Sequence, residues 1–435
     1  MRAWSALLLA FALFVLSAMP EAVLAHAILL RTDPAPNQQL PTAPAQVRLL
    51  FSEPIDPQFS RVAVFNSEGV QVDRGDSHVD DTQLLVSLPP GLPNGAYGVQ
   101  WRSLSTIDVH PEVGEYQLFV GVPVTATTAA STSQRSESTP PTVFARWWLY
   151  VAASLFAGAL ATWKVVLGPL LGAETQVRNE ALGRGKKLAV IAGVLLLVGT
   201  LFAAVAQAAA AAGVPLESSV GAPLRDLLTR GRFAGIWWPR FAISLVAVVI
   251  VAWRGLDDAW SESAAAMVPA ILLTNSLTSH GAALPSAITG VVLDWLHVLA
   301  AAVWVGGLAT LALVAPLLRP QPSLLQSIVR RFTWLAGAAV VALVASGTVQ
   351  AIFEVGSLDA LVNTMYGQGI LVKIGLLLAM LAIALAVRTR RKMRAVRVEL
   401  ALGVVVLAVA AIVAGTTPAR QSAPIAPPAA VQSPR

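Results

Sequence analysis

The sequence predicts two fold classes in one chain, an N-terminal all-β sandwich or small barrel joined to an all-α membrane domain of about eight transmembrane helices. Short runs of alternating apolar and polar residues fill positions 26–120, whereas long apolar segments follow position 144. Of the 435 residues, 56% are hydrophobic and only 12% are charged. This composition is unlike that of a soluble protein and requires membrane spans.

A secretory leader is predicted before both domains. Residues 1–25 combine a basic residue, Arg2, with an apolar core and a run of small residues that ends at Ala25, which is the pattern of a signal peptide. The apolar core is shorter than a transmembrane helix needs, and an uncleaved anchor is the alternative interpretation. Cleavage after Ala25 would make His26 the first residue of the mature chain.

The β-domain is predicted from short segments in which apolar and polar residues alternate. These segments lie at 47–51, 61–65, 83–86, 97–101 and 116–120. Turn sequences such as Pro89-Pro90-Gly91 and Pro93-Asn94-Gly95 separate them. Short strands at this spacing are typical of a β-sandwich or small barrel, and the span of about 95 residues is the usual size of such a domain.

A flexible linker, a helical membrane domain and a tail are expected to follow. Residues 121–143 are rich in Thr, Ala and Ser and end in Pro140-Pro141, which is typical of a linker. The membrane domain is predicted over 144–415, and residues 416–435 are expected to be a disordered tail. The apolar segments long enough to cross a bilayer are 144–167, 188–212, 236–253, 264–284, 289–317, 332–353, 368–387 and 398–414.

Basic residues in alternate connections predict the orientation of these helices. The connections rich in Lys and Arg are 168–187, 318–331 and 388–397, whereas 285–288 and 354–367 contain neither. Positive charge favours the cytoplasmic side, so we expect a multi-pass protein of the cytoplasmic membrane with the β-domain and the C-terminus outside. The basic connection 213–235 is the exception, and its pattern suits a short amphipathic helix at the interface. The net charge of +6 therefore reflects orientation in a lipid bilayer, and no nucleic-acid partner is expected.

Histidine is the main metal ligand that this chain can offer. The chain contains no cysteine, which excludes disulfides, zinc–thiolate sites and thiolate relays for copper(I). The five histidines are at positions 26, 78, 110, 280 and 297. His78 lies in a polar turn and is expected to be a solvated loop residue.

A copper(II) site is predicted from the mature N-terminus and an Asp-x-His sequence. His26 as first residue offers its α-amine and its imidazole to one ion, and an α-amine loses its proton more readily than a lysine does. Asp108 and His110 are two apart on an extended segment, so their side chains point to the same face. Three nitrogens and one oxygen suit copper(II). The alternative for Asp108 and His110 is a surface pair or a loop cap.

Several short motifs of residues 26–120 resemble the CopC family of periplasmic copper-binding domains. They include His26-Ala27-x-Leu29, Asp33-Pro34-Ala35, Phe51-Ser52-Glu53-Pro54 and Asp108-x-His110. The resemblance implies a Greek-key β-barrel that binds copper(II) through His26, Asp108 and His110. Residues 26–120 contain no methionine. The methionine-rich copper(I) site of some relatives is therefore not expected here.

Three polar residues in the predicted membrane helices are candidate functional groups. His280 closes the fourth apolar segment, and Asp294 and His297 lie in the fifth. Ionisable residues inside apolar helices are rare and usually functional. Asp294 and His297 are three apart, so Asp294 is predicted to orient the imidazole as a second-shell partner. The alternative is that each histidine merely hydrogen-bonds across a helix interface.

This part of the chain resembles the CopD family of copper-resistance membrane proteins. The matching motifs include Ser279-His280-Gly281-Ala282, Asp294-Trp295-Leu296-His297, Ser346-Gly347-Thr348-Val349-Gln350 and Thr364-x-Tyr366-Gly367. The resemblance implies copper acquisition across the cytoplasmic membrane, with His280 and His297 as candidate copper ligands. The role of Lys373 in the same region stays open, because it could be an ion-pair partner or a lysine that reaches the interface.

Copper uptake is the leading functional hypothesis, in which the outer domain captures copper(II) and the membrane domain carries copper inward. The sequence contains no ATP-binding loop, so transport would depend on gradients or on trapping of the metal. A second hypothesis is copper sequestration or resistance, by buffering, sensing or export, with the membrane part as an anchor. A third is a copper-dependent oxidase, but Asp108 would fill the position that oxygen chemistry needs open. No enzymatic activity is therefore expected.

Overall fold

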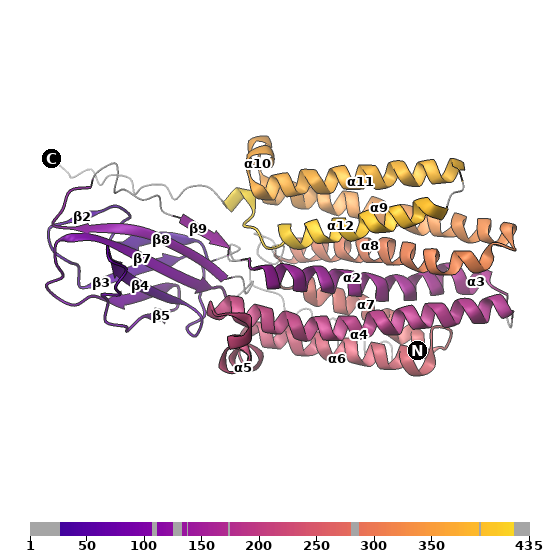
Figure 1. The fold of residues 1–435 in the computed structure, drawn as a ribbon, viewed down its shortest axis with the longest axis horizontal. Helices are drawn as coiled ribbons and strands as arrows, with labels where there is room; N and C mark the ends of the chain where they lie inside the picture. The colour runs from indigo at the N-terminus through magenta and orange to yellow at the C-terminus, as the bar shows by residue number, and fades with distance from the viewer. Residues whose placement is uncertain are drawn as a thin grey trace. The chain divides into compact units, whose positions relative to one another are not determined.

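The computed structural model describes residues 27–106, 111–124, 133–136, 138–172, 175–279, 287–390 and 393–421. Within these residues the chain forms two compact units, one built mainly from the segment up to residue 137 and one from residues 138–416. Figure 1 shows strands in the first unit and helices in the second. Each unit is described by itself below.

The β-unit is a sandwich of two sheets within the described residues (Figure 1). The first sheet has the order β1 (Leu29–Asp33), β3 (Gln46–Phe51), β6 (Gln83–Ser87) and β5 (His78–Asp80). The second has the order β2 (Gln39–Leu40), β8 (Pro111–Val120), β7 (Gly95–Leu104) and β4 (Arg61–Asn66). Strand β9 (Ser133–Ser136) pairs with the first half of β8, on the same edge of β8 as β2. All five predicted strands are present, and the predicted β-sandwich is confirmed.

Alternation along the strands forms the core of this unit. Side chains two apart on a strand share a face, so one face of each strand is buried between the sheets. Phe51 of β3 and Trp101 of β7 pack edge to face across the core, with ring centroids 5.3 Å apart. The other large buried residues include Val47, Leu49, Val64, Leu84, Val86, Val99, Tyr116 and Leu118.

Two elements of regular structure lie within the segment predicted as a linker. Strand β9 pairs antiparallel with β8, and helix α2 (Pro140–Thr162) begins four residues before the predicted start of the membrane domain at 144. Pro140-Pro141 is typical of a linker, yet proline is also favoured in the first turn of a helix. The N–H groups of that turn have no acceptor within the helix, so the missing N–H of proline costs no hydrogen bond. The helix therefore begins inside the range predicted as a linker.

The helical unit contains a series of long helices. After α2, a π-helical turn (Trp163–Leu167) and α3 (Gly168–Leu170), these are α4 (Gln176–Ala212), α5 (Ala222–Thr229), α6 (Gly231–Arg254), α7 (Trp260–Ser276), α8 (Ala287–Val314), α9 (Pro322–Val355), α10 (Leu358–Asn363), α11 (Met365–Arg390) and α12 (Met393–Val413). Among the described residues, seven helices are long and apolar enough to cross a membrane. The short helix α5 lies where the sequence predicts an amphipathic helix.

Helix α7 covers the fourth predicted apolar segment, but with 17 residues it is not among the seven helices that are long and apolar enough to cross a membrane. Arg232, at the start of α6, donates to the carbonyl oxygen of Leu277, just beyond the end of α7, at 3.1 Å. Trp295, near the start of α8, donates to the carbonyl oxygen of Pro269 in α7 at 2.8 Å. The end of α7 therefore lies beside the starts of both neighbouring helices, so α7 runs antiparallel to each of them.

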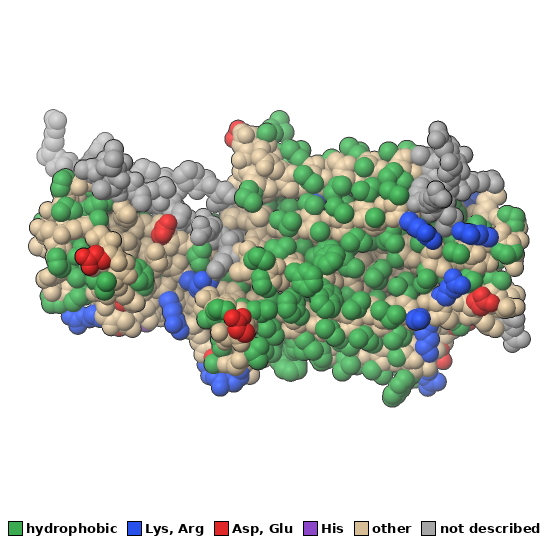
Figure 2. Space-filling model, in the orientation of Figure 1, with side chains coloured by type: hydrophobic (Ala, Val, Ile, Leu, Met, Phe, Trp, Pro, Cys, Tyr) green, Lys and Arg blue, Asp and Glu red, His purple; other side chains and the backbone are tan. Residues whose placement is uncertain are grey.

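The surface of the helical unit is that of a membrane protein. Figure 2 shows apolar side chains over its middle, and Lys and Arg gathered at the end where α4 begins and α11 ends. Large exposed apolar residues include Ile191, Val198 and Leu201 on α4 and Trp334 and Val341 on α9. An apolar surface of this kind is stable in contact with lipid, which supports the multi-pass arrangement.

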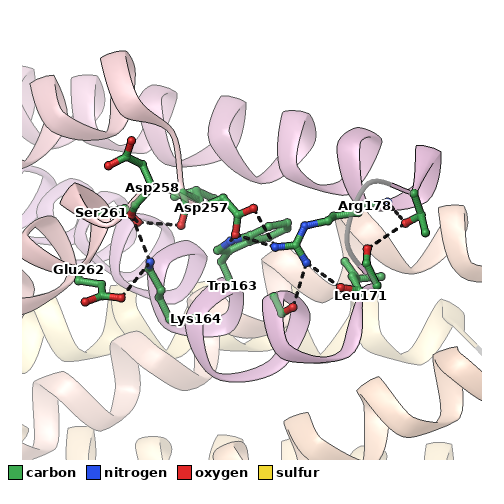
Figure 3. Close-up of polar contacts among 12 residues, drawn as sticks. Trp163, Lys164, Leu171, Arg178, Asp257, Asp258, Ser261 and Glu262 are labelled. Carbon is green, nitrogen blue, oxygen red and sulfur yellow. Dashed lines mark hydrogen bonds and ion pairs between the residues drawn. The ribbon is translucent and has the colours of Figure 1, made fainter.

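A polar cluster joins three segments at the basic end of the unit (Figure 3). Arg178 of α4 donates to both carboxylate oxygens of Asp257 at 2.8 Å and to the carbonyl oxygens of Gly168 and Leu171 at 3.0 and 2.6 Å. Its guanidinium also lies 5.7 Å from the centre of the Trp163 ring. The hydrogen bonds of Arg178 hold the pKa of the Asp257 carboxyl below its usual range. This cluster fixes the α6–α7 connection against α3 and α4.

Candidate metal centres

The predicted copper(II) ligands of the β-unit, His26, Asp108 and His110, lie outside the described residues. Their immediate neighbours in the chain are described. Residues 27 and 28 follow His26, Thr106 precedes the second ligand segment, and Pro111 begins β8 directly after His110. These neighbours show where in the β-unit the two ligand segments are attached.

The loop at Ser52–Pro54 holds both of these neighbouring segments. The amide of Ile28 donates to Ser52 Oγ at 3.0 Å, and the amide of Ser52 donates back to the Ile28 carbonyl oxygen at 2.9 Å. The amide and the hydroxyl of Thr106 both donate to the Pro54 carbonyl oxygen, at 3.2 and 3.1 Å. The start of the described β-unit and the end of β7 therefore lie on the same loop.

Two buried carboxylates border these segments, and the sequence analysis did not select them. Glu53 lies inside the loop that binds Ile28 and Thr106, and Glu112 is the second residue of β8; each is only 1% exposed. A buried carboxylate requires hydrogen-bonding or charged partners, and carboxylates commonly orient metal-bound imidazoles. Both could have been noticed in the sequence, because Glu53 precedes Pro54 at the end of an alternating segment and Glu112 follows His110 by two residues.

His78 is exposed, as predicted, but it is the first residue of strand β5 and not a loop residue. Its Nδ1 lies 2.9 Å from the backbone oxygen of Asp76 in the same turn. Because it interacts with its own turn and faces solvent, His78 serves below as a control residue.

In the helical unit, His297 of α8 contacts α9 rather than Asp294. Its Nδ1 lies 3.2 Å from Ser346 Oγ, and Ser346 Oγ lies 2.7 Å from the backbone oxygen of Ala342. No hydrogen bond joins Asp294 to His297 among the described residues, so the predicted orienting role of Asp294 is not seen. Residues three apart on a helix differ by about 60° in direction, which is enough to face different neighbours.

Asp294 faces the end of α7. Ser276 and Ser279 lie near its carboxylate, and the Ser279 hydroxyl donates to the backbone oxygen of Ser276 at 2.9 Å. One oxygen, Oδ2, is buried and makes no hydrogen bond to any residue in the described part of the chain. Ser279 immediately precedes His280, which lies outside the described residues. Asp294 therefore lies next to the segment that carries the second predicted membrane histidine.

A second polar pair lies close by, between α9 and α11. The Tyr366 hydroxyl donates a hydrogen bond to the buried carboxylate of Glu354. Lys373 of α11 lies within electrostatic range of both Glu354 and Asp294. The sequence analysis did not select Glu354, because a single Glu at the end of an apolar segment is usually a solvated end residue. Its partner is twelve residues away on another helix.

The two polar clusters, that of Asp294 and His297 and that of Glu354, Tyr366 and Lys373, lie at the same end of the helical unit. They lie at the starts of α8 and α11 and at the ends of α7 and α9, opposite the basic end. Tyr150 of α2 belongs to the same region, since its hydroxyl interacts with Asn275 of α7 and with Asp294. No group of three metal-binding side chains is assembled within the described ranges. A metal at His297 would therefore need further ligands, and the sequence predicts His280, which lies outside the described residues, as one of them.

Comparison with known protein families covers most of the chain. The model of the CopC domain matches residues 29–121, that of the Copper resistance protein D-like N-terminal domain matches residues 137–290, and that of Copper resistance protein D matches residues 326–413. The chain is 30% identical to Copper transport protein CutJ of Bacillus subtilis over 430 residues, which cover 94% of this chain and 76% of CutJ. It is 33% identical to Protein YobA of Escherichia coli over 116 residues, which cover 26% of this chain and 91% of YobA.

Solved structures match the β-unit. CopC from Methylosinus trichosporium OB3b is 28% identical, covers 22% of this chain and is itself 93% covered, with a TM-score of 0.20. PcoC, a methionine-rich copper resistance protein from Escherichia coli, is 26% identical, covers 22% of this chain and is 99% covered, with a TM-score of 0.20. The full-length relative and the family matches in both units lead to one conclusion: the chain belongs to the copper transport and resistance family in which a CopC domain is fused to a CopD-type membrane domain.

Proposed function

We propose that this protein imports copper across the cytoplasmic membrane. The β-domain lies outside and captures copper(II) through His26, Asp108 and His110. The membrane domain then passes copper inward past His280 and His297. Copper is the transported substrate in this proposal, and the protein has no catalytic role.

The observation that carries this proposal is the location of His297 and its polar neighbours. The chain leaves the β-unit and enters the helical unit at Pro140, and Tyr150, three turns into α2, interacts with Asp294. The polar groups therefore lie at the membrane face to which the β-domain is attached. The basic connections 168–187, 318–331 and 388–397 lie at the opposite end, which the positive-inside rule assigns to the cytoplasm, and 213–235 is the exception. A polar site in the part of the helical unit that the chain enters from the β-domain is consistent with uptake.

Support for the outer site comes from the loop at Ser52–Pro54. It hydrogen-bonds Ile28, two residues after His26, and Thr106, two residues before Asp108. The two segments that carry the predicted ligands are far apart in the sequence, yet both are attached next to the same loop. An amine, two imidazoles and a carboxylate are a donor set that suits copper(II).

Copper resistance by export or buffering is the second candidate, and the names of the matching membrane-domain models favour it. Export and uptake use the same sites in opposite directions, so they differ in the copper content of the cell. Buffering by the outer domain alone needs neither His280 nor His297.

Cellular copper content tests the direction. A deletion strain is complemented with the wild-type protein, His280→Ala, His297→Ala or the control His78→Ala, which makes the same substitution at an exposed histidine. Uptake predicts a copper deficit that wild type and His78→Ala restore and that the other two variants do not. A deletion that raises cellular copper would show export and contradict the proposal.

Copper(II) titration of the isolated β-domain tests the outer site. A domain that begins at His26 should bind one copper(II), because both the α-amine and the imidazole of His26 are free. The same domain with one extra N-terminal residue loses the amine and should bind far more weakly. His78→Ala in the domain that begins at His26 should leave binding unchanged. Equal affinity with and without the extra residue would refute the amine as a ligand.

A further inference from the structure

We propose that Ser346 and Gly347 of α9 are positioning residues that hold the imidazole of His297 with its proton on Nδ1. Nε2 is then the nitrogen that presents a lone pair to copper. The proposal rests on the role of His297 in the proposed function and specifies which atom of the ring binds the metal. It also gives the Ser346-Gly347 sequence of the membrane domain a physical role.

The hydrogen bonds of Ser346 determine the direction of its contact with the imidazole. A serine hydroxyl has one hydrogen to donate and two lone pairs that accept. Ser346 Oγ lies 2.7 Å from the backbone oxygen of Ala342, one helical turn earlier. Two oxygens at this distance require a hydrogen between them, so the hydroxyl donates to Ala342. The contact of 3.2 Å between Ser346 Oγ and His297 Nδ1 is then donated by Nδ1–H.

A second acceptor on α9 agrees with this direction. The backbone oxygen of Leu343 lies 3.3 Å from the same hydroxyl and also interacts with the His297 ring. The polar atoms that α9 presents to the imidazole are thus acceptors. A neutral imidazole carries one N–H, and only the neutral ring binds a metal. With the proton on Nδ1, the lone pair is on Nε2.

Gly347 provides the space that this contact needs. A Cβ atom at position 347 would lie 3.0 Å from Cε1 and 3.2 Å from Nδ1 of His297. These distances are shorter than ordinary carbon contacts, so any side chain would push the ring away from Ser346. The absence of a side chain at Gly347 therefore lets the backbone of α9 lie directly against the Nδ1 edge of the imidazole.

The arrangement fits the way proteins usually prepare a histidine ligand. A metal-binding imidazole commonly donates its other N–H to a fixed acceptor, which sets the tautomer and the ring orientation. The sequence predicted that Asp294 would be this acceptor, and the structure assigns the role to Ser346. Asp294 is then left to interact with α7 and with the segment that carries His280.

Nitrogen-15 NMR of the full-length protein, labelled at histidine and free of copper, tests the tautomer directly. The signals of His297 are identified as those missing from the His297→Gln spectrum. We expect a protonated Nδ1 and an unprotonated Nε2. A protonated Nε2 with an unprotonated Nδ1 would overturn the proposal, and this readout does not depend on whether the protein transports copper.

Copper(I) affinity of the purified full-length protein, measured in competition with bicinchoninate, tests the positioning role. Loss of a partner of this kind typically weakens metal binding by about 10- to 100-fold, and we expect this range for Ser346→Ala and Gly347→Ala. Ser346→Thr keeps the hydroxyl and should retain most of the affinity. Ser327→Ala is the matched control, because Ser327 on the same helix is partly exposed and its hydroxyl donates to the backbone oxygen of Ser323, one turn earlier, at 3.1 Å.

The result from His297→Gln separates the two claims. If His297→Gln weakens copper(I) binding and Ser346→Ala does not, the positioning role is refuted and the role of His297 stands. If His297→Gln leaves binding unchanged, His297 is not a ligand and the proposed function fails at this residue. In that event the tautomer claim would stand only if Nδ1 is protonated in the wild-type protein and this protonation is reduced in Ser346→Ala.

Discussion

Replacement of Arg178 by methionine should destabilise the helical unit, because the Arg178 guanidinium joins three segments at the basic end of the bundle (Figure 3). The side chain of Arg178 is only 17% exposed, whereas Asp257 is 41% exposed. Arg178→Met removes the hydrogen bonds to Asp257 and those to the carbonyl oxygens of Gly168 and Leu171. Methionine keeps much of the apolar stem, so the change isolates the polar contacts.

The magnitude follows from the exposure of each partner. A hydrogen bond from a charged donor contributes about 1.5–3 kcal/mol, and an exposed ion pair contributes about 0.2–1 kcal/mol. The two contacts to carbonyl oxygens are hydrogen bonds from a charged donor, whereas the contact to Asp257 is closer to an exposed ion pair. Water can partly replace the lost partners, so we expect a total loss of about 2–4 kcal/mol, of which about 1 kcal/mol is the coupling between Arg178 and Asp257.

Thermal unfolding of the purified protein in detergent measures this loss. At about 2–4 °C per kcal/mol, Arg178→Met should lower the Tm by roughly 4–16 °C. Arg184→Met is the matched control on the same helix, since Arg184 makes a single contact of 3.2 Å to the Leu313 carbonyl oxygen. The reasoning is refuted if Arg178→Met lowers the Tm no more than Arg184→Met, or if Arg178→Met and Asp257→Asn are strictly additive.

Three further predictions concern stability. Gly306→Ala should cost about 1–3 kcal/mol, because its Cβ would meet the backbone of α2, whereas Gly337→Ala, in open space on α9, should not lower the Tm. The pKa of Asp257 is lower in the folded protein than the value of about 3.9 in the unfolded chain, so ionised Asp257 stabilises the fold at pH values above 3.9. This stabilisation is lost as the pH falls through the pKa of the folded protein. The Tm difference between wild type and Asp257→Asn should therefore be constant from pH 7 to 5 and vanish in stronger acid. In the isolated β-domain, Leu49→Ala should cost about 2–5 kcal/mol in urea unfolding, while Leu30→Ala, at an exposed position, should cost less than about 0.5 kcal/mol. An equal loss for the members of either pair, or a pH-independent Tm difference, would contradict the corresponding argument.

The β-strands were predictable because burial between two sheets imposes a period of two on the sequence. The strand β3, for example, alternates apolar Val47, Leu49 and Phe51 with partly or fully exposed residues. The membrane helices were predictable because the bilayer requires long apolar segments. The start of α2 was less predictable, because Pro140-Pro141 suits both a linker and the first turn of a helix.

The polar contacts in the membrane domain depend on packing that sequence spacing does not contain. Spacing placed Asp294 and His297 near each other on α8 but did not show that α7 and α9 would separate them. Ser346 lies 49 residues from His297, and its role depends on the close approach of α9 at Gly347. The family resemblance indicated that Ser346 and Gly347 belong to a motif, and the structure supplies a physical reason for both.

Copper flux through the purified protein tests the central claim most directly. The full-length protein is placed in liposomes that contain a fluorescent copper chelator, and copper is added outside. Copper that remains outside the liposomes is removed before the fluorescence of the internal chelator is measured. The account predicts that the internal signal rises faster with wild type and with His78→Ala than in protein-free liposomes, and that His297→Ala abolishes the increase. Flux that persists at the wild-type rate in His297→Ala, or no flux with the wild-type protein, would contradict the account.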